Sequence, residues 1–238
     1  IECEQAILDY LCKINFPIRV VSEEHGVVEC HPNPQYLGVL DGLDGSGVYK
    51  EAPGTGRYAT MFGIFSGLNP RYEDYFVFGI VEHALKTIYI GEKGMGAYLI
   101  NSNKEKKPIH CADTQILDTS IDIRIDECWE TNRTIFSDPL ISYNTSCGKC
   151  SAIYYADVAT GKASLALECT RKGNLELAVA YGLIREAGGV MVDLNGQDIG
   201  KQEYLSFGQE PNDHLPIITA ATPELASSLV RYLQDKVG

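Results

Sequence analysis

The sequence predicts an α/β protein. Segments in which apolar residues recur with the period of a helix alternate with short apolar runs that are typical of buried strands. The chain has 238 residues, of which 45% are hydrophobic and 22% charged, so it can bury a sizeable core as one large domain or two small ones. It contains no apolar run long enough to cross a membrane and no signal-peptide pattern, which favours a cytoplasmic location.

Apolar spacing and β-branched residues predict where the elements lie. Strands are expected over residues 18–22, 37–40, 58–67, 75–83, 85–90, 97–100, 164–167, 190–193 and 217–220. Helices are expected over residues 1–13, 154–160, 175–187 and 223–237. Polar residues, Gly and Pro predict loops at 25–35 and 47–57, the second of them flexible and at the mouth of a site. The glycines of 91–96 indicate a hairpin, because no helix pattern follows them as a dinucleotide-binding turn would require.

The segment from Leu37 to Ser46 is the most informative part of the chain. Its apolar run ends in Asp-Gly-Leu-Asp-Gly-Ser, which places Asp41 and Asp44 three residues apart after a buried strand. Hard cations take oxygen ligands, and Mg²⁺ usually binds one or two carboxylates together with substrate phosphate oxygens. Backbone N–H groups at Gly45 can approach a phosphate closely. An isolated Asp-Gly turn is common on protein surfaces, so this motif alone is weak evidence for a cation site.

Further acidic motifs strengthen the prediction. Residues 22–24, Ser-Glu-Glu, follow an expected strand, and open α/β sheets place ligands beyond the carboxyl ends of strands. Glu176 and the Glu-Ala-Gly-Gly of 186–189 come much later. If these carboxylates converge with Asp41 and Asp44, their like charges form a costly cluster unless cations neutralise it.

Together these motifs resemble those of the inositol monophosphatase/fructose-1,6-bisphosphatase superfamily. The matching residues are Val21 to Glu24, Asp41 to Ser46, and Glu176 followed by Glu186 to Gly189, in the family's order and over nearly the whole chain. The resemblance implies a layered αβαβα sandwich. It implies one catalytic domain with two subdomains, about 1–108 with the metal motifs and 109–238 at the C-terminus. It also implies a magnesium-dependent phosphomonoesterase acting on inositol-1-phosphate, fructose-1,6-bisphosphate or both, as small archaeal-type members do.

The resemblance also implies a set of metal ligands. Glu23 and Asp41 would bind one Mg²⁺ with the carbonyl of Leu43, and Asp41, Asp44 and Glu176 would bind a second. Two such ions can clamp the attacking and leaving oxygens of an in-line displacement.

Catalytic roles follow from the same resemblance. Glu24 matches a carboxylate that lies behind the ligands or binds a third ion, so two or three Mg²⁺ are expected. Ser46 matches the hydroxyl that helps to activate the nucleophilic water, and the N–H groups of Gly45 and Ser46 would hold the phosphate. A helix N-cap at Ser46 is the structural alternative, and both roles can coexist.

Substrate contacts are expected in the second half of the chain. Ser146 lies where the family has its substrate loop, and Glu168, Arg171 and Lys172 precede the last ligand. Arg171 and Lys172 can hold a second phosphate, which favours a sugar bisphosphate. That they are solvated surface charges is an equally good interpretation.

Three positions depart from the family pattern. Gly42 replaces a Pro, which we expect to loosen the turn, and Val48 replaces an Asn. Leu175-Glu176 replaces the Trp-Asp of inositol monophosphatases and is closer to the fructose-bisphosphatase form. Two alternatives therefore stay open: a phosphatase of 3′-phosphoadenosine phosphates, and a non-catalytic relative that binds metal or a partner.

Charge and cysteine content restrict the partners. A net charge of −12 argues against nucleic acid as a partner. We also expect a small phosphorylated substrate, no membrane contact and a homodimer. The eight cysteines are interpreted mostly as reduced thiols of a cytosolic protein. Cys147 and Cys150 form a CxxC that is either a redox pair or half a zinc site, and no second CxxC supplies the other half.

The N-terminus is expected to be incomplete. The chain does not begin with Met, and the family's Asp, four residues before the Glu that matches Glu4, would fall just before Ile1. We therefore expect the sequence to be a fragment, whose missing segment includes an Asp that acts with Ser46.

Overall fold

The computed structural model describes residues 2–126, 130–170, 175–203 and 215–237. Its strands are β1 (Ile18–Ser22), β2 (Gly26–Glu29), β3 (Tyr36–Asp44), β4 (Ala59–Ser66), β5 (Tyr75–Glu82), β6 (Thr87–Glu92), β7 (Gly96–Ile100), β8 (Lys106–Ile109), β9 (Ile123–Asp126), β10 (Thr145–Gly148), β11 (Leu165–Thr170), β12 (Val190–Val192) and β13 (Leu215–Ala220). Its α-helices are α1 (Glu2–Lys13), α2 (Ser46–Glu51), α3 (Glu130–Asn132), α4 (Ser151–Ala159), α5 (Leu175–Glu186) and α6 (Pro223–Val237). Short turns of other helical types are η1 (Tyr72–Asp74), η2 (Arg133–Ser137) and η3 (Ile199–Lys201).

The strands form two sheets. The first has the order β2-β1-β3-β4-β5-β6-β7-β8, and its neighbours are antiparallel except for the parallel pair β1 and β3. The second has the order β10-β9-β11-β13-β12, in which β9 runs parallel to β10 and β11. The first sheet ends at β8 and the second begins at β9, and on this basis we propose two subdomains that divide near residue 108.

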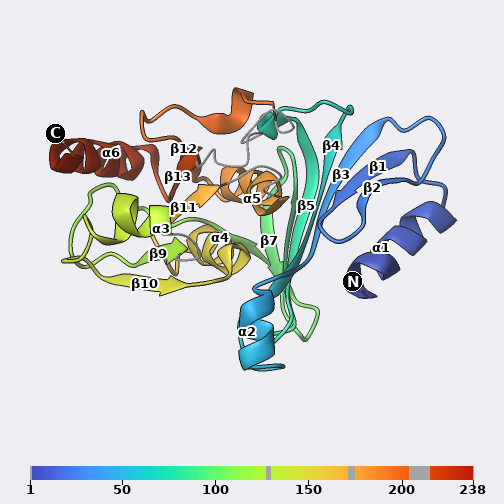
Figure 1. The fold of residues 1–238 in the computed structure, drawn as a ribbon, viewed down its shortest axis with the longest axis horizontal. Helices are drawn as coiled ribbons and strands as arrows, with labels where there is room; N and C mark the ends of the chain where they lie inside the picture. Colours follow the sequence, from blue (N-terminus) through green and yellow to red (C-terminus); the bar gives the residue numbers. More distant parts are fainter. Residues whose placement is uncertain (1, 127–129, 171–174, 204–214, 238) are drawn as a thin grey trace.

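Helix composition explains the layers. Figure 1 shows the layers from right to left. The helix α1 packs on one face of the first sheet, α4 and α5 fill the space between the sheets, and α6 covers the outer face of the second sheet. Almost every described residue of α4 and α5 is buried, as expected for helices that are apolar all round. The outer helices are amphipathic: α1 buries Leu8 and Leu11 against the first sheet, and α6 buries Leu225 and Leu229 against the second. The predicted αβαβα sandwich is confirmed.

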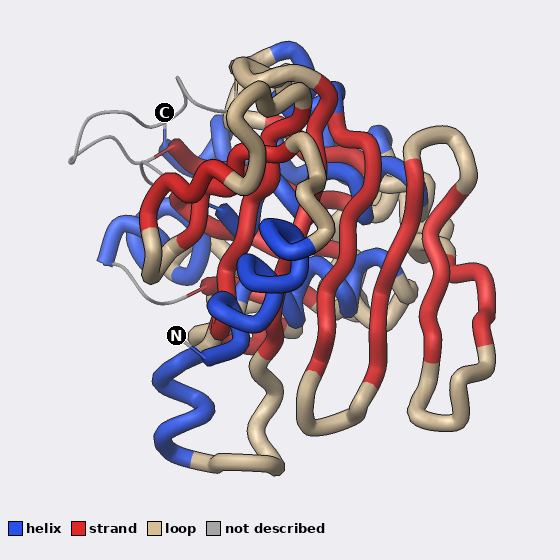
Figure 2. The backbone as a smooth tube through the Cα atoms, turned by 90° about the vertical axis from the view of Figure 1, so that its right-hand side faces the viewer, coloured by secondary structure: helices blue, strands red, loops and turns tan. Residues whose placement is uncertain are grey.

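Strand residues alternate between these layers. Ala166 of β11 packs in the cluster shared with α4 and α5, whereas its neighbours Leu165 and Leu167 pack in the cluster under α6. In the same way, Val39 of β3 faces the central helices and Leu40 faces α1. β3 and β11 are therefore covered on two faces, which explains why these strands read as nearly continuous apolar runs. Figure 2 shows α1 crossing in front of the first sheet.

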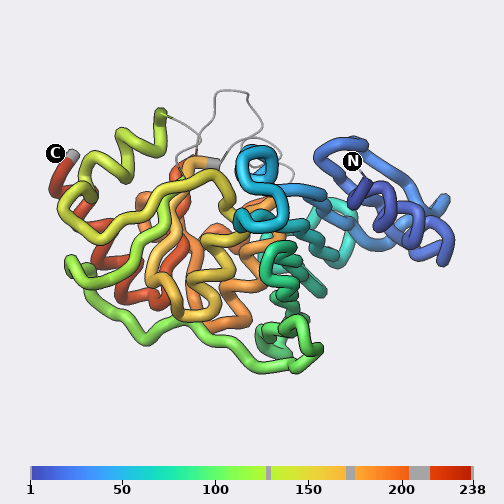
Figure 3. The backbone as a smooth tube through the Cα atoms, turned by 90° about the horizontal axis from the view of Figure 1, so that it is seen from below, coloured from blue at the N-terminus to red at the C-terminus, as the bar shows by residue number. Residues whose placement is uncertain are grey.

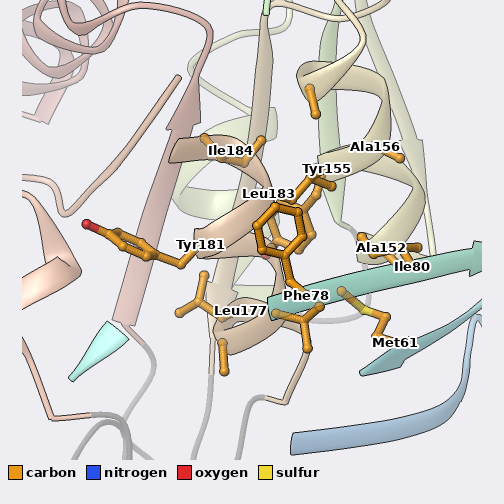
Figure 4. Close-up of a cluster of buried hydrophobic side chains, with 14 of the residues drawn as sticks. Met61, Phe78, Ile80, Ala152, Tyr155, Ala156, Leu177, Tyr181, Leu183 and Ile184 are labelled. Carbon is orange, nitrogen blue, oxygen red and sulfur yellow. The ribbon is translucent and has the colours of Figure 1, made fainter. Parts of the chain in front are cut away.

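The largest apolar cluster joins the two sheets through α4 and α5. Figure 4 shows Phe78 of β5 pointing between these helices, with Met61 and Ile80 beside it and Leu183 of α5 behind. Each of these four side chains is at most 2% exposed. The packing fixes α5 against the first sheet, and α5 carries Glu176 at its start.

Two predicted loops contain regular structure. The segment 25–35 includes β2, because residues 26–29 pair with β1 in an antiparallel hairpin at the sheet edge. The segment 47–57 includes most of α2, which protrudes between the N-terminal and C-terminal parts of the molecule in Figure 3. Neither element buries an apolar stripe, so periodicity gave no sign of them.

The interpretation of the cysteines as reduced is wrong for two of them. Cys12, near the end of α1, and Cys30, just after β2, form a disulfide. The hairpin of β1 and β2 brings Cys30 beneath α1, and this proximity cannot be read from the sequence spacing. Five other cysteines of the described part are reduced, including Cys147 and Cys150.

The predicted absence of a membrane-spanning helix agrees with the structure, since none of its described helices has the length and apolar character needed to cross a bilayer.

Truncation of Leu183 tests the central layer. Leu183 is fully buried, so Leu183→Ala should lower the free energy of unfolding by about 2–5 kcal/mol through lost burial and the cavity left behind. Leu85→Ala is the matched control, because Leu85 is 52% exposed. Urea denaturation of the two variants measures the difference, and equal losses would contradict the proposed role of the layer.

Candidate active site

The carboxyl ends of β1 and β3 lie side by side because the two strands are parallel neighbours. Ser22 pairs with Leu40, and the N–H of Glu23 donates to the carbonyl of Leu40 at 3.1 Å. Glu23 therefore leaves β1 next to Asp41, the first acidic residue of β3. The structure thus brings together two motifs that are separated by a loop and a hairpin strand in the sequence.

A β-bulge turns Asp41 and Asp44 to the same side of β3. Asp41 pairs with Met61 and Asp44 with Ala59, so three steps along β3 oppose two along β4. In a regular strand, side chains three positions apart point to opposite faces. Here the carboxylate oxygens of Asp41 and Asp44 come within 4.8 Å of each other. The motif read as a turn is the bulged end of a strand.

Glu176 reaches the same place from the first turn of α5. Oxygens of Asp41, Asp44 and Glu176 lie within 4.8 Å of one another, and oxygens of Glu4, Glu23 and Asp41 do so in a second group. Asp41 belongs to both groups. The four carboxylates proposed as ligands therefore form one continuous acidic cluster at the seam between the two sheets.

Neighbouring backbone groups hold Asp41 and Asp44 in place. The N–H of Leu43 donates to Asp41 Oδ1 at 2.8 Å, and the N–H of Ala152, in α4, donates to Asp44 Oδ2 at 2.7 Å. The Cys150 thiol contacts the same Asp44 oxygen at 3.1 Å. Asp44, one of the proposed ligands, is thus oriented by the start of a helix in the second half of the chain.

The electrostatics of the cluster fit a divalent cation. Burial raises the pKa of Asp41, Asp44 and Glu176, and repulsion among neighbouring carboxylates raises each pKa further. The charged forms have lost solvation and oppose one another. The donor atoms are all carboxylate oxygens, the ligand type that Mg²⁺ prefers. A bound Mg²⁺ would relieve both penalties, so the residues present fit this ion.

Gly45 and Ser46 lie where β3 passes into α2. Gly45 caps the helix with φ at +81°, and a Cβ there would lie 3.0 Å from the Cys150 side chain. Only glycine adopts this conformation without strain and fits the space. Ser46 is the first residue of α2 rather than its N-cap, so the structural alternative for Ser46 is wrong.

Of the four substrate contacts predicted in the second half of the chain, the structure describes Glu168 and Ser146. Glu168 of β11 is buried, accepts a hydrogen bond from the Tyr155 hydroxyl, and has its pKa raised well above its usual range by burial and by Asp126. Ser146 of β10 accepts a hydrogen bond from Arg124. Arg171 and Lys172 lie outside the described residues.

Sequence reasoning gave no role to Glu4, Asp126 or Cys150, all of which take part in the site. Asp126 ends β9 and raises the pKa of Asp44, Glu168 and Glu176. Glu4 lies in α1, an outer layer, where an acidic residue normally faces water. The side chain of Glu24 is exposed, while its N–H donates to Glu4.

Comparisons with known proteins identify relatives over the whole chain. A model of the inositol monophosphatase family matches residues 1–237. A fructose-1,6-bisphosphatase/inositol-1-monophosphatase of Thermococcus kodakarensis is 26% identical over 235 residues, which covers 92% of this chain and 76% of the relative. A bifunctional NADP phosphatase/NAD kinase of Methanococcus maripaludis is 29% identical over 196 residues, which covers 76% of this chain but only 34% of that longer protein.

Solved structures share the fold. The extragenic suppressor protein suhB of Bartonella henselae superposes with a TM-score of 0.77 at 17% identity and covers 98% of this chain and 82% of its own. An inositol monophosphatase of Thermotoga maritima has a TM-score of 0.74 at 16% identity and covers 99% of this chain and 82% of its own.

The raised carboxylate pKa values predict how pH affects stability. In the metal-free protein, these three carboxyl groups make a contribution to the free energy of unfolding that is fully present below their unfolded-state pKa of about 4. This contribution is lost as pH rises through their raised folded-state pKa values. Mg²⁺ binds the ionised carboxylates, so it should raise the melting temperature more at pH 8.5 than at pH 5.5.

Melting curves with and without MgCl₂ measure this difference. Asp44→Asn removes one repelling charge, so the metal-free variant should melt above wild type at pH 8.5 and gain less from MgCl₂. An equal gain at both pH values in both proteins would contradict the interpretation.

Proposed function

Because the chain belongs to the inositol monophosphatase family, we propose that this phosphatase is a magnesium-dependent phosphomonoesterase of small sugar or polyol phosphates. The expected substrates are inositol-1-phosphate and fructose-1,6-bisphosphate, the pair that the name of the Thermococcus relative contains. The observation that carries the proposal is the convergence of Asp41, Asp44 and Glu176 at the point where Gly45 begins a helix.

The carboxylates would hold the ions in two overlapping sets. Glu23 and Asp41, with the Leu43 carbonyl, would form one set, and Asp41, Asp44 and Glu176 the other. Two or three bound Mg²⁺ would neutralise the cluster, bind the substrate phosphate and lower the pKa of a bound water. The hydrogen bond from the Ala152 N–H of α4 would keep the Asp44 carboxylate directed toward the ion that it shares with Asp41 and Glu176.

The phosphate and the water would be oriented by groups beside the carboxylates. We assign the N–H groups of Gly45 and Ser46 to the phosphate, since the left-handed Gly45 turns the backbone at the end of β3. The Ser46 hydroxyl would orient the nucleophilic water. Glu24 is exposed next to Glu23 and would act on the third ion or on its water ligands.

Substrate hydroxyls would meet Glu168 and Ser146. Glu168 is buried beside Asp126, Ser151 and Tyr154, next to the acidic cluster. A buried carboxyl there can hydrogen-bond a sugar hydroxyl and reject substrates without one. Arg171 and Lys172 stay proposed as contacts for a second phosphate.

A phosphatase of phosphorylated adenine nucleotides is the second candidate. The Methanococcus relative is named as an NADP phosphatase, and NADP and 3′-phosphoadenosine phosphates both carry a phosphomonoester on an adenosine ribose. A non-catalytic relative is the third alternative. Homodimer formation and a cytoplasmic location stay predictions.

Phosphate release from four substrates tests the proposal. Inositol-1-phosphate, fructose-1,6-bisphosphate, NADP and 3′-phosphoadenosine 5′-phosphate are compared with MgCl₂ and with EDTA. We expect release from the first two that EDTA abolishes. Asp44→Asn should lower the rate by more than about 100-fold, because even partners outside the ligand shell typically contribute about 10- to 100-fold.

Asp235→Asn is the matched control. Asp235 is exposed on α6, on the outer face of the second sheet, so this change should leave the rate unchanged. Faster release from NADP or 3′-phosphoadenosine 5′-phosphate would favour the nucleotide phosphatase. Release that is unaffected by EDTA would contradict the metal-dependent mechanism.

A further inference from the structure

Glu4 is a fully buried carboxylate in a helix of the outer layer. Its Oε2 accepts hydrogen bonds from the Ser22 hydroxyl at 2.6 Å and the Glu24 N–H at 3.1 Å, and it lies 2.9 Å from His25 Nδ1. Its Oε1 accepts a hydrogen bond from the Gly42 N–H at 2.9 Å. An ionised carboxylate only accepts, so Nδ1 of His25 carries the proton of this contact.

The partners of Glu4 flank two of the proposed ligands. Ser22 and Glu24 are the residues on either side of Glu23, and Gly42 directly follows Asp41. One carboxylate from α1 therefore ties the end of β1 to the bulge of β3, and each tie is made next to a ligand. Glu23 itself is exposed and follows the strand, and its own N–H donates to the carbonyl of Leu40.

Glu4 is placed to position ligands rather than to be one. Its oxygens lie within 4.8 Å of those of Glu23 and Asp41, a distance that would also suit a ligand. Three of the four contacts are made to Oε2 and one to Oε1, so Oε2 has no acceptor site left for a cation. Binding a cation through Oε2 would require Glu4 to give up hydrogen bonds that compensate its burial.

Gly42 is matched to Glu4 in two ways. Its N–H donates to Glu4, and a Cβ at this position would lie 2.4 Å from Glu4 Cγ. On the other side of the same residue, the Gly42 carbonyl accepts a hydrogen bond from the Thr60 hydroxyl at 2.8 Å, and that hydroxyl lies 2.9 Å from His83 Nε2. The N–H and the carbonyl of Gly42 are thus both bonded, and the expectation that glycine loosens this turn stays a prediction.

We propose that Glu4 is a positioning residue for the metal site and that its position in this chain is matched to glycine at position 42. The pair holds the backbone beside Glu23 and Asp41 in the geometry that binds the cation, so its main effect is on metal affinity. This inference rests on the proposed metal site, and it goes further by assigning a function to a residue of α1 and to the departure at Gly42.

Metal binding to the metal-free protein tests the role of Glu4. Glu4→Gln keeps the shape of the side chain but replaces one of its two acceptor oxygens with an N–H₂ group, which must face the N–H of Gly42 or that of Glu24, so the network loses an acceptor and its negative charge. Titration calorimetry with Mg²⁺ should show binding at least about 10-fold weaker than wild type, as expected for a partner outside the ligand shell. The rate at saturating Mg²⁺ should change much less than the Mg²⁺ concentration needed for half activity.

Glu2→Gln is the matched control, because Glu2 is exposed in the same helix. Wild-type affinity in Glu4→Gln would overturn the proposal. Loss of one bound ion without weaker binding of the others would identify Glu4 as a ligand and would also overturn it.

A double-mutant cycle tests the match between Glu4 and Gly42. Gly42→Ala should lower the melting temperature and the Mg²⁺ affinity because its Cβ displaces Glu4. Glu4→Ala removes the atom that this Cβ meets, so Gly42→Ala should have little further effect in that background. Additive losses would contradict the proposed pair.

The cycle also separates this inference from the proposed function. Melting temperatures are measured without metal or substrate, so the coupling is observed even if no phosphate is released. Coupling without catalysis would reject the proposed function alone, whereas catalysis with additive losses would reject the inference alone.

Discussion

Repulsion among buried carboxylates is the constraint on which the site depends. Asp41, Asp44 and Glu176 are brought together by a strand bulge and a helix start, and each has its pKa raised by burial and by its neighbours. Such a cluster destabilises the metal-free fold unless its charge is compensated. A divalent cation bound as proposed would compensate this repulsion.

The layered architecture supplies that packing. Glu176 is fixed by α5, which is buried between the sheets, and Asp44 is held by the N–H of Ala152 at the start of α4. Glu4 approaches from α1 on the opposite face of the first sheet. Elements from three layers therefore converge on the bulge of β3. A change in the relative position of the layers would alter the ligand geometry, so stability of the core and metal affinity are linked.

Much of this could be predicted from the sequence, because the relevant signals are local. Apolar periodicity predicted most strands and the helix α5, and the spacing of Asp41 and Asp44 predicted a cation site. The contacts that orient the ligands could not be predicted. The bulge depends on the register with β4, and the contact of Glu4 with Gly42 spans 38 positions. These are tertiary pairings, and neither residue type nor spacing specifies them.

Anomalous scattering from crystals grown with Mn²⁺ would test the central claim most directly, because manganese takes the same oxygen ligands as Mg²⁺. The account predicts one peak among the carboxylates of Asp41, Asp44 and Glu176, and a second between Glu23 and Asp41. Glu4 should keep its hydrogen bonds and lie outside the ligand shell. Crystals saturated with Mn²⁺ that show no peak at these carboxylates, or peaks only elsewhere, would contradict it.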